Sequence, residues 1–343
     1  MRFLFFVIAV FSFSSCYSQT LKDEISSILS KYKIPGISLA YIQNGKVSQE
    51  LSLGKANKEK GQNVTTNTVF SAASLSKPVF AYAVMQMADK GQIHLDTPLY
   101  KYFTWPDIAY DPRNKQITAR MVLSHTSGLP NWRKRNDTLR FQYEPGTRFR
   151  YSGEGYVYLS KVVEKITGQP IEEYMQATIF QPLGMTRSGY IWRKSFEPDF
   201  GVPHNDDGDA EENYFPESAN LAASLQTTAS DYAKFLIALM NSRNLSANVY
   251  KEMFTPQPLA RMQKTGDELF WALGLASQHT KEGLAFWQWG DNGNWKAFVM
   301  IYPDRKEGLV YFTNSTRGMD AASEILSLFF KGKQPSLEWL RSL

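Results

Sequence analysis

Cysteine is almost absent from this sequence, since Cys16 is the only one among 343 residues. A mature chain that begins after this position has no internal disulfide, no thiol nucleophile and no thiolate ligands for a metal. Histidine is also scarce, and the four histidines are far apart and show no H-E-x-x-H spacing (His94, His125, His204 and His279). A structural role is therefore favoured over metal binding for each of them.

Charge of one sign is not concentrated anywhere. Lys and Arg number 38 and Asp and Glu number 33, which gives a net charge of +5 at pH 7, and the basic residues are scattered among the acidic ones. Such a distribution does not follow a phosphate backbone, so nucleic acid is not expected as a partner. The hydrophobic content of 43% and the length suit one large domain or two closely packed ones.

Long hydrophobic runs are missing as well. The run at residues 3–13 is too short for a bilayer core that needs ~20 helical residues. It follows Arg2 and precedes small and polar residues, so we expect residues 1–18 to be a signal peptide and the protein to be exported to the periplasm or cell envelope. An ordinary cleavage site is favoured. Residues 14–16 also resemble a lipoprotein box, and a lipid on Cys16 would tether the protein to a membrane.

The rest of the chain alternates between two periodicities. Apolar residues at helical spacing begin at Leu21, and the pair Asn44-Gly45 marks a tight hairpin turn between strands at residues 36–43 and 46–53. Helical periodicity then predominates, with helices predicted at residues 74–90, 118–125, 153–167, 171–179 and 230–241. Strands are predicted at residues 270–277, 284–289, 295–302 and 308–314, followed by a helix at residues 318–330.

This order of elements predicts an α+β fold. Strands from the N- and C-terminal segments form one antiparallel sheet, the terminal helices flank it, and an all-helical lobe is inserted. Within residues 19–343 we expect an α/β lobe at about residues 19–70 and 220–343 and a helical lobe at about residues 71–219. Clefts commonly form where lobes meet. The aperiodic stretch at residues 192–218 fits either the rim of a site or an exposed loop.

A catalytic serine in this chain would need a base other than histidine. The sequence has no G-x-S-x-G elbow and no histidine in a recognisable triad motif. Ser74 and Lys77 offer another arrangement, because residues three apart at the start of a helix share a face. Apolar neighbours would bury the amine and lower its pKa. The same spacing recurs at Ser30 and Ser52, where only surface residues are expected, so the spacing alone is not specific.

A resemblance to known families supplies the missing specificity. Residues 69–77 and 91–96 resemble the nucleophile helix and the following turn of serine β-lactamase relatives. Residues 117–129, with His125 in a structural role, closely match a stretch found throughout class C β-lactamase-like families. The resemblance covers roughly residues 34–314. It implies the β-lactamase/transpeptidase-like fold and a serine hydrolase that becomes acylated at Ser74 without a metal or organic cofactor.

The second motif of these families, Y-x-N, is matched within residues 144–153. It nominates Tyr151, whose phenol would share general-base and general-acid duty with Lys77. Gly153 stands where the motif has asparagine, so an amide that usually contacts the acyl side chain is missing.

The third motif, K-T-G or H-x-G, is poorly preserved. Its best match is the set Asp291, Asn292 and Gly293. The family's Lys or His helps to hold the carboxylate of penicillins or of a terminal D-alanine, and Asp291 would repel that group. By analogy, the backbone N–H groups of Ser74 and Asn294 would form the oxyanion hole. Asp291 fits a turn cap equally well, and Lys296 or an arginine of the helical lobe could supply a positive charge.

The catalytic groups are thus retained while two recognition groups differ. The altered motifs favour an esterase-, amidase- or D-aminopeptidase-like activity on small-molecule or peptide-like substrates over true β-lactamase action. Two alternatives stay open, namely a D,D-carboxypeptidase or weak class C-like β-lactamase, and a catalytically silent homologue that binds cell-wall fragments or another protein. Three tryptophans either wall the pocket or belong to the core (Trp287, Trp289 and Trp295).

Overall fold

The computed structural model describes residues 19–134, 137–262 and 269–342. The predicted signal peptide and Cys16 lie outside these residues. Within them, no helix combines the length and the apolar character needed to cross a membrane. The predicted opening helix is present over residues 19–32, with Leu21, Ile25 and Ile28 buried.

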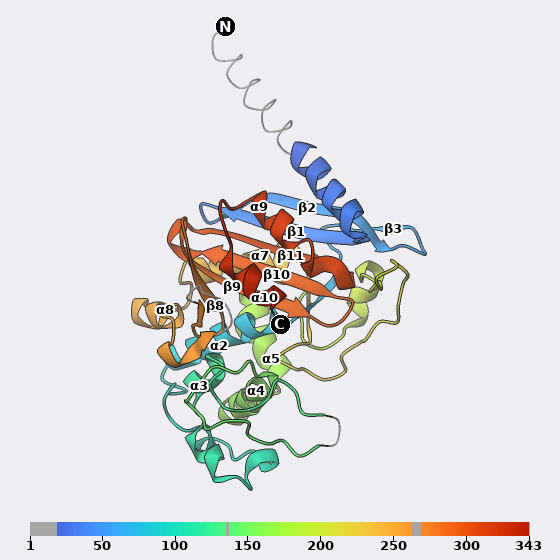
Figure 1. Cartoon of the computed structure of the whole chain (residues 1–343). Helices are drawn as coiled ribbons and strands as arrows, with labels where there is room; N and C mark the ends of the chain where they lie inside the picture. The colour runs from blue at the N-terminus through green and yellow to red at the C-terminus, as the bar shows by residue number, and fades with distance from the viewer. Residues whose placement is uncertain (1–18, 135–136, 263–268, 343) are drawn as a thin grey trace.

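One nine-stranded antiparallel sheet forms the centre of the molecule (Figure 1). Its order is β3-β2-β1-β11-β10-β9-β8-β7-β6, so strands from the two ends of the chain are neighbours at β1 and β11. This confirms the predicted sheet built from N- and C-terminal segments. The strands are β1 (Gly36–Gln43), β2 (Lys46–Asn57), β3 (Gln62–Asn63), β6 (Arg261–Met262), β7 (Leu269–Trp271), β8 (Ala276–Thr280), β9 (Gly283–Asp291), β10 (Lys296–Tyr302) and β11 (Glu307–Thr313).

The hairpin of β1 and β2 forms as predicted. Asn44 and Gly45 both adopt positive φ angles, 53° and 72°, which a two-residue turn requires. Side chains alternate along β1, so that Leu39 belongs to the core under the terminal helices and Ala40 to the core on the opposite face. The sheet therefore separates two hydrophobic cores.

Helices cover both faces of this sheet. The helix over residues 19–32 shares one core with α9 (Ala322–Ser327) and α10 (Pro335–Arg341). On the other face, α7 (Ala229–Met240) packs against β1 and β11 and belongs to the same core as the helical segment. Figure 1 shows that this helical segment extends away from the sheet on the side opposite to the terminal helices.

Side-chain caps begin two helices of this segment, those at Ala119–Leu123 and Gly153–Thr167. Thr118 Oγ1 accepts a hydrogen bond from Met121 N at 3.2 Å, and Ser152 Oγ accepts one from Gly155 N at 3.0 Å. The helices predicted from residues 118 and 153 therefore start at these caps. The α-helices from this segment to α8 are α2 (Ser76–Asp89), α3 (Ala119–Leu123), α4 (Gly153–Thr167), α5 (Ile171–Met175), α6 (Gln181–Leu183), α7 and α8 (Ala247–Met253).

Several predicted elements have different boundaries in the structure; the strand predicted at residues 46–53, for example, continues to Asn57 in β2. Residues 270–277, predicted as one strand, form β7 and β8 with a turn between them. Gly274 has a φ of 104° in this turn, and its N–H donates to Leu123 O at 3.0 Å. The predicted terminal helix is shorter, because a 3-10 turn at Thr316–Met319 precedes α9.

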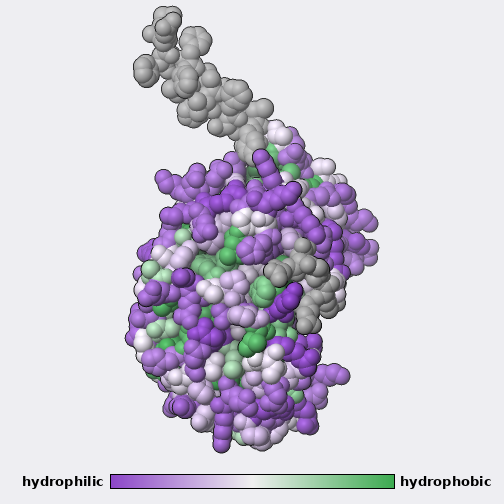
Figure 2. Space-filling model, turned by 60° about the vertical axis from the view of Figure 1, so that its left-hand side comes forward, coloured by the Kyte–Doolittle hydropathy of each residue, from purple (hydrophilic) through white to green (hydrophobic). Residues whose placement is uncertain are grey.

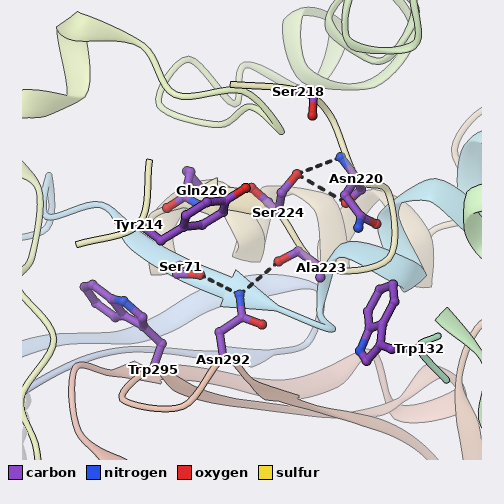
Figure 3. A pocket seen from close by; sticks show the side chains of 10 residues that line it. All are labelled: Ser71, Trp132, Tyr214, Ser218, Asn220, Ala223, Ser224, Gln226, Asn292 and Trp295. Atoms are coloured by element: carbon purple, nitrogen blue, oxygen red, sulfur yellow. Dashed lines mark hydrogen bonds between the residues drawn. The ribbon is translucent and has the colours of Figure 1, made fainter. Parts of the chain in front are cut away.

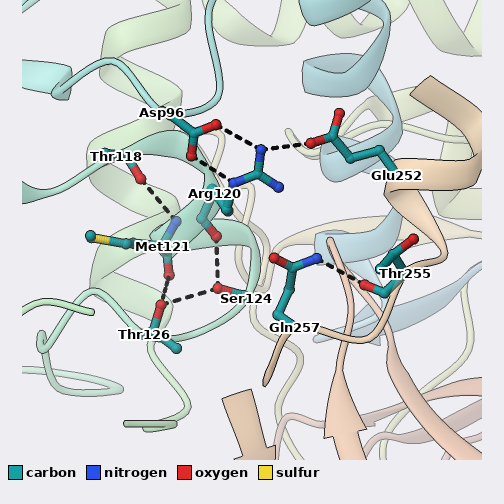
Figure 4. A network of polar contacts seen from close by, with 9 residues as sticks. All are labelled: Asp96, Thr118, Arg120, Met121, Ser124, Thr126, Glu252, Thr255 and Gln257. Carbon is teal, nitrogen blue, oxygen red and sulfur yellow. Dashed lines mark hydrogen bonds and ion pairs between the residues drawn. The ribbon is translucent and has the colours of Figure 1, made fainter. Parts of the chain in front are cut away.

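A polar network joins α3 to its neighbours (Figure 4). The Arg120 guanidinium donates to both oxygens of Asp96, at 2.6 and 2.7 Å, and to Glu252 of α8 at 2.6 Å. These partners raise the pKa of Arg120 further above its ordinary value, so it stays charged. The network fixes the turn after α2 against α3, the helix that leads into His125.

A small second sheet pairs the segment before α2 with the segment before α7. Its strands are β4 (Phe70–Ala73) and β5 (Leu225–Thr227), which pair in antiparallel fashion. Ser74 lies directly after β4, between this small sheet and α2. On the face seen in Figure 2, the described surface is mostly hydrophilic, and the hydrophobic residues form small separate patches.

Candidate active site

Ser74 and Lys77 meet at the start of α2. The chain turns sharply after β4, because Ala73 adopts a φ of 48°, and Lys77 lies in the first turn of the helix. Lys77 Nζ is 3.0 Å from Ser74 Oγ and also donates a hydrogen bond to Ala222 O at 2.8 Å. The S-x-x-K spacing thus places the amine within proton-transfer distance of the hydroxyl.

Lys77 is completely buried among aromatic rings. Its Nζ lies 4.7, 5.7 and 5.9 Å from the ring centroids of Tyr151, Tyr156 and Trp132. Burial lowers the pKa of Lys77 well below its usual value, and no carboxylate among the described residues offsets this effect. The amine is therefore neutral over a wider pH range than an exposed lysine and can accept a proton.

Tyr151 completes a three-residue cluster with Ser74 and Lys77. Its hydroxyl accepts a hydrogen bond from Gln288 Nε2 at 2.8 Å and lies close enough to Ser74 for the serine hydroxyl to lower the pKa of the phenol. Burial raises the pKa of Tyr151 above its usual value, and these two neighbours offset only part of that rise. The phenol is thus protonated near neutral pH. The structure brings together the hydroxyl, the amine and the phenol that the sequence singles out.

His125 holds the backbone on both sides of Tyr151. Its carbonyl accepts from Arg150 N at 2.7 Å, and its ring Nδ1 accepts from Ser152 N at 3.0 Å. The imidazole also packs against the Tyr151 ring, with 4.3 Å between centroids. Burial, together with the nearby Lys77, lowers the pKa of His125 well below its usual value, so the ring is neutral. The sequence indicates a structural histidine, and the structure shows which residue it positions.

Gln288 is the strand residue that contacts this cluster. Besides reaching Tyr151, its Nε2 donates to Ser74 O at 3.2 Å. The sequence places the third motif at Asp291, Asn292 and Gly293, whereas the β9 side chain that contacts Ser74 and Tyr151 in the structure is that of Gln288, two residues before Gly290. Both Gly290 and Gly293 can serve as the glycine that ends this motif, since they lie three residues apart, and the sequence alone does not show which of them approaches the residues before Ser74.

Packing distinguishes the two glycines. A Cβ added to Gly290 would lie 2.5 Å from Ala72 O and 3.3 Å from Ala73 Cβ, so β9 approaches the residues before Ser74 at this point. A Cβ added to Gly293 would meet nothing within 4 Å. Gly293 is instead needed for its φ of 68° in the turn between β9 and β10. The close approach of backbones therefore belongs to Gly290.

The turn residues have contacts of their own. Asp291 Oδ1 accepts from Gly293 N at 2.9 Å and pairs with Lys296 Nζ at 2.5 Å, so Asp291 caps the turn and its charge is matched. Asn294 Nδ2 donates to Glu211 Oε2 at 2.6 Å. Asn292 Nδ2 donates to Ser71 Oγ and to Ala223 O, both at 3.1 Å. Of these side chains, that of Asn292 lines a cavity. The cavity adjoins the catalytic cluster through Trp132, whose ring centroid lies 5.9 Å from Lys77 Nζ, and through Ala223, which follows the residue that accepts from Lys77.

Trp132 occupies the space of the asparagine that the second motif lacks. A Cβ added to Gly153 would lie 2.5 Å from the Trp132 ring, so a larger residue here would require the indole to move. Trp132 could not be singled out from the sequence, because it lies in an irregular segment 21 residues before Gly153 along the chain. Its side chain is 45% exposed and forms one wall of the cavity.

The cavity beside these residues has a volume of about 470 Å³ (Figure 3). Tyr214 and Ser218 contribute to its lining, so the stretch at residues 192–218 forms part of the rim. Of the three tryptophans, Trp295 lines the cavity, whereas Trp287 is fully buried in the core under the terminal helices. Trp289 packs against Trp287, with 6.0 Å between the ring centroids, and its ring is 4.9 Å from that of Tyr151. Among the described residues, no cluster of His, Cys, Asp or Glu is arranged to hold a metal.

The sequence of this chain matches a known protein family. Residues 21–329 match the Beta-lactamase family. The chain belongs to this family. It is a serine hydrolase family that includes β-lactamases, penicillin-binding proteins and esterases, and whose members act on small esters, amides or peptides.

Two curated bacterial relatives illustrate the range. The putative penicillin-binding protein PbpX of Bacillus subtilis is 26% identical over 249 residues, which cover 68% of this chain and 62% of that protein. Esterase EstB of Burkholderia gladioli is 28% identical over 209 residues, or 52% of each chain. The chain thus spans about three fifths and one half of the lengths of these relatives.

Solved structures share the fold. The octameric penicillin-binding protein homologue from Pyrococcus abyssi has a TM-score of 0.76 at 25% identity, covering 87% of this chain and 74% of that one. A class C β-lactamase has a TM-score of 0.79 at 22% identity, covering 93% and 98%. The β-lactamase/transpeptidase-like fold predicted from the sequence is therefore confirmed.

Proposed function

We propose that this chain is a serine hydrolase that cleaves esters or amides through an acyl-Ser74 intermediate, with esterase-, amidase- or D-aminopeptidase-like specificity. The observation that carries the proposal is the position of Lys77. A fully buried amine without a carboxylate partner among the described residues lies 3.0 Å from a serine hydroxyl. Burying an amine is unfavourable unless its charge is lost, and a neutral amine is the base that the serine requires.

Acylation begins when Ser74 Oγ attacks the carbonyl carbon of the substrate. The hydroxyl proton passes to Lys77 Nζ, whose remaining N–H groups keep the hydrogen bond to Ala222 O. The negative charge that develops on the carbonyl oxygen is stabilised by the backbone N–H of Ser74 and a backbone N–H of β9 near Gly290, where the two backbones approach. This replaces Asn294 as the proposed strand contributor.

Collapse of the tetrahedral intermediate needs a proton for the leaving group. Tyr151 is protonated near neutral pH and lies close to Ser74, so its hydroxyl can deliver that proton and be reprotonated from Lys77. In the second half-reaction, water attacks the acyl carbon and gives a proton to the same pair of residues. Ser74 regains its hydroxyl when the acid product leaves.

Ester or amide specificity is supported by the recognition groups that differ. Gln288 brings an uncharged amide to the position where the strand meets Ser74 and Tyr151. Trp132 replaces a hydrogen-bonding side chain by an aromatic surface at Gly153. We expect short-chain aryl esters to be hydrolysed faster than a chromogenic cephalosporin, and the opposite ranking would favour a D,D-carboxypeptidase or β-lactamase.

A fluorophosphonate probe tests the covalent mechanism. The wild-type protein should form a covalent adduct that is absent in Ser74→Ala. Ser30→Ala is the matched control, because Ser30 and Lys33 have the same spacing but lie exposed on the opening helix and its end. Its adduct should form at the wild-type rate. No adduct in the folded wild-type protein would favour a silent binding homologue.

We also propose that the protein is exported, on the evidence of the short apolar segment that follows Arg2. Mass spectrometry of the N-terminus of the protein from its native host should show residues 1–18 removed. A lipid on Cys16 would instead show a membrane-tethered form, and an intact N-terminus would contradict export by this route.

A further inference from the structure

The cavity beside Ser74 is lined without a single charged side chain. The ten described residues that form it are aromatic, hydroxyl-bearing, amide-bearing or alanine (Ser71, Trp132, Tyr214, Ser218, Asn220, Ala223, Ser224, Gln226, Asn292 and Trp295). Its volume of about 470 Å³ is in the range of a site for a small organic molecule. Figure 3 shows Asn292 at the floor between Ser71 and Ala223, with Trp132 and Tyr214 on different sides.

Two described cations that directly follow lining residues are already paired. Arg133, which follows Trp132, donates to Glu154 at 2.9 Å and to Asp107 at 2.6 Å. Lys296, which follows Trp295, is paired with Asp291 at 2.5 Å, and only 13% of its side chain is exposed. Recruiting either cation to a substrate would leave a carboxylate without its partner, which is unfavourable.

Acidic residues accompany the rim. Tyr214 and Ser218 lie in a segment that also carries Glu211, Glu212 and Glu217, all of them exposed. A carboxylate approaching this rim would meet charges of its own sign before reaching the cavity. Within the cavity it would exchange water for amides, hydroxyls and aromatic faces, which do not replace its hydration as a cation would.

We propose that the substrate group held in this cavity carries no negative charge, so that the enzyme acts on uncharged esters or amides and discriminates against those with a carboxylate. This inference rests on the proposed function and specifies its substrate class. Gln288 agrees with it, because its side chain presents an uncharged amide where a lysine would present a cation.

A pair of esters that differ only at the far end tests the inference. The two are 4-nitrophenyl esters of adipic acid, one ending in a free carboxylate and the other in a carboxamide. Near neutral pH we expect kcat/KM to be at least about tenfold higher for the carboxamide, since none of the described residues that line the cavity is a cation that could pair with a desolvated carboxylate. Equal rates, or a faster carboxylate ester, overturn the inference.

A charge introduced at the rim sharpens the test. Ser218 lines the cavity, is exposed, and takes no part in the catalytic cluster. Ser218→Lys should raise kcat/KM for the carboxylate ester and so reduce the ratio of kcat/KM between the carboxamide and the carboxylate ester. Ser218→Gln, which adds a neutral side chain of similar length, should leave this ratio, the gap between the two esters, unchanged. If Ser218→Lys leaves the gap as wide as Ser218→Gln does, the inference is wrong.

The fluorophosphonate probe separates this inference from the proposed function. An enzyme that forms the Ser74 adduct but shows no preference between the two esters retains the function and loses the substrate class. A protein that forms no adduct and hydrolyses neither ester loses both.

Discussion

The two walls of the active site differ in how they are held. The first wall, formed by the start of α2 and the Tyr151 segment, is buried, and its polar groups contact one another. The second wall, formed by the end of β9 and its turn, is largely exposed at Asp291 and Asn292, and its side chains contact the rim. The first wall keeps the serine, lysine and tyrosine of its family motifs, although Gly153 replaces an asparagine, whereas the second wall lacks the Lys or His of its motif.

This difference shows which requirements are strict. On the buried wall, the residues depend on one another. Lys77 is positioned against Ser74, and His125 holds the backbone beside Tyr151, so replacing one residue affects the position or the pKa of its neighbours. On the strand wall, the requirement is a backbone that can approach Ala72 and Ala73, which Gly290 alone satisfies. Substrate recognition can therefore change there while the chemistry is retained.

Removing the amine of the buried wall should have the largest effect. Lys77→Met preserves the volume of the side chain and removes the proposed base, so we expect kcat to fall by roughly 10³-fold or more. Steady-state hydrolysis of a short-chain aryl ester measures this, with circular dichroism as the control for folding. Near-normal turnover would show that Lys77 is not the base.

The same variant should reveal the low pKa of Lys77 through stability. In the wild type, the pKa of Lys77 is lower in the folded state than in the unfolded state. Between these two pKa values the unfolded chain binds one more proton than the folded chain. The free energy of unfolding of the wild type therefore increases as pH rises through that range. The Tm of Lys77→Met minus that of the wild type should therefore decrease from pH 6 to pH 9. A difference that stays constant or grows would contradict a neutral buried amine.

For the phenol, we expect a smaller loss. Tyr151→Phe keeps the ring packed against His125 and removes the hydroxyl that contacts Ser74 and Gln288, so kcat should fall by roughly 10²-fold. Measuring esters with leaving groups of different pKa identifies the step. The loss should be greatest for poor leaving groups, which need a proton, and an equal loss for all would contradict a role as general acid.

The residues of the first wall could be predicted from the sequence, whereas the contacts of the strand wall could not. Ser74, Lys77 and Tyr151 lie in segments whose helical spacing and motif context are local, so they could be found without coordinates. Gln288 could not, because its role depends on the register between β9 and β10 and on which glycine β9 uses to approach Ala72. Two glycines three residues apart are equivalent in sequence and differ only in packing.

In the fold, too, features set by neighbouring residues could be predicted from the sequence, and features set by distant contacts could not. The hairpin at Asn44-Gly45 and the helix from Gly153 follow from turn and cap chemistry within a few residues, and both form as predicted. The break between β7 and β8 depends on Gly274, whose N–H bonds to Leu123 in the helical segment. Trp132 is similar, since only tertiary packing brings it to Gly153. Contacts between distant segments decide these features.

His125 tests whether the buried wall depends on a residue that does not touch substrate. Asn and Leu have similar size, but only Asn can accept the hydrogen bond from Ser152 N, so His125→Leu should lose about tenfold in kcat with little change in KM, and His125→Asn less. Both should lose some Tm, because both remove the buried ring. Equal kcat in the two variants would contradict positioning through this hydrogen bond.

The strand wall should give the smallest effect. Asp291→Asn keeps an oxygen that accepts from Gly293 N, and Asp291 contacts Lys296 and not the catalytic cluster, so kcat/KM for an uncharged aryl ester should change by less than about threefold. Asp291→Ala, which also removes the turn cap, is the comparison, and its Tm should be the lower of the two. A tenfold loss in Asp291→Asn would show that this carboxylate touches the substrate and that the strand wall takes part in the chemistry.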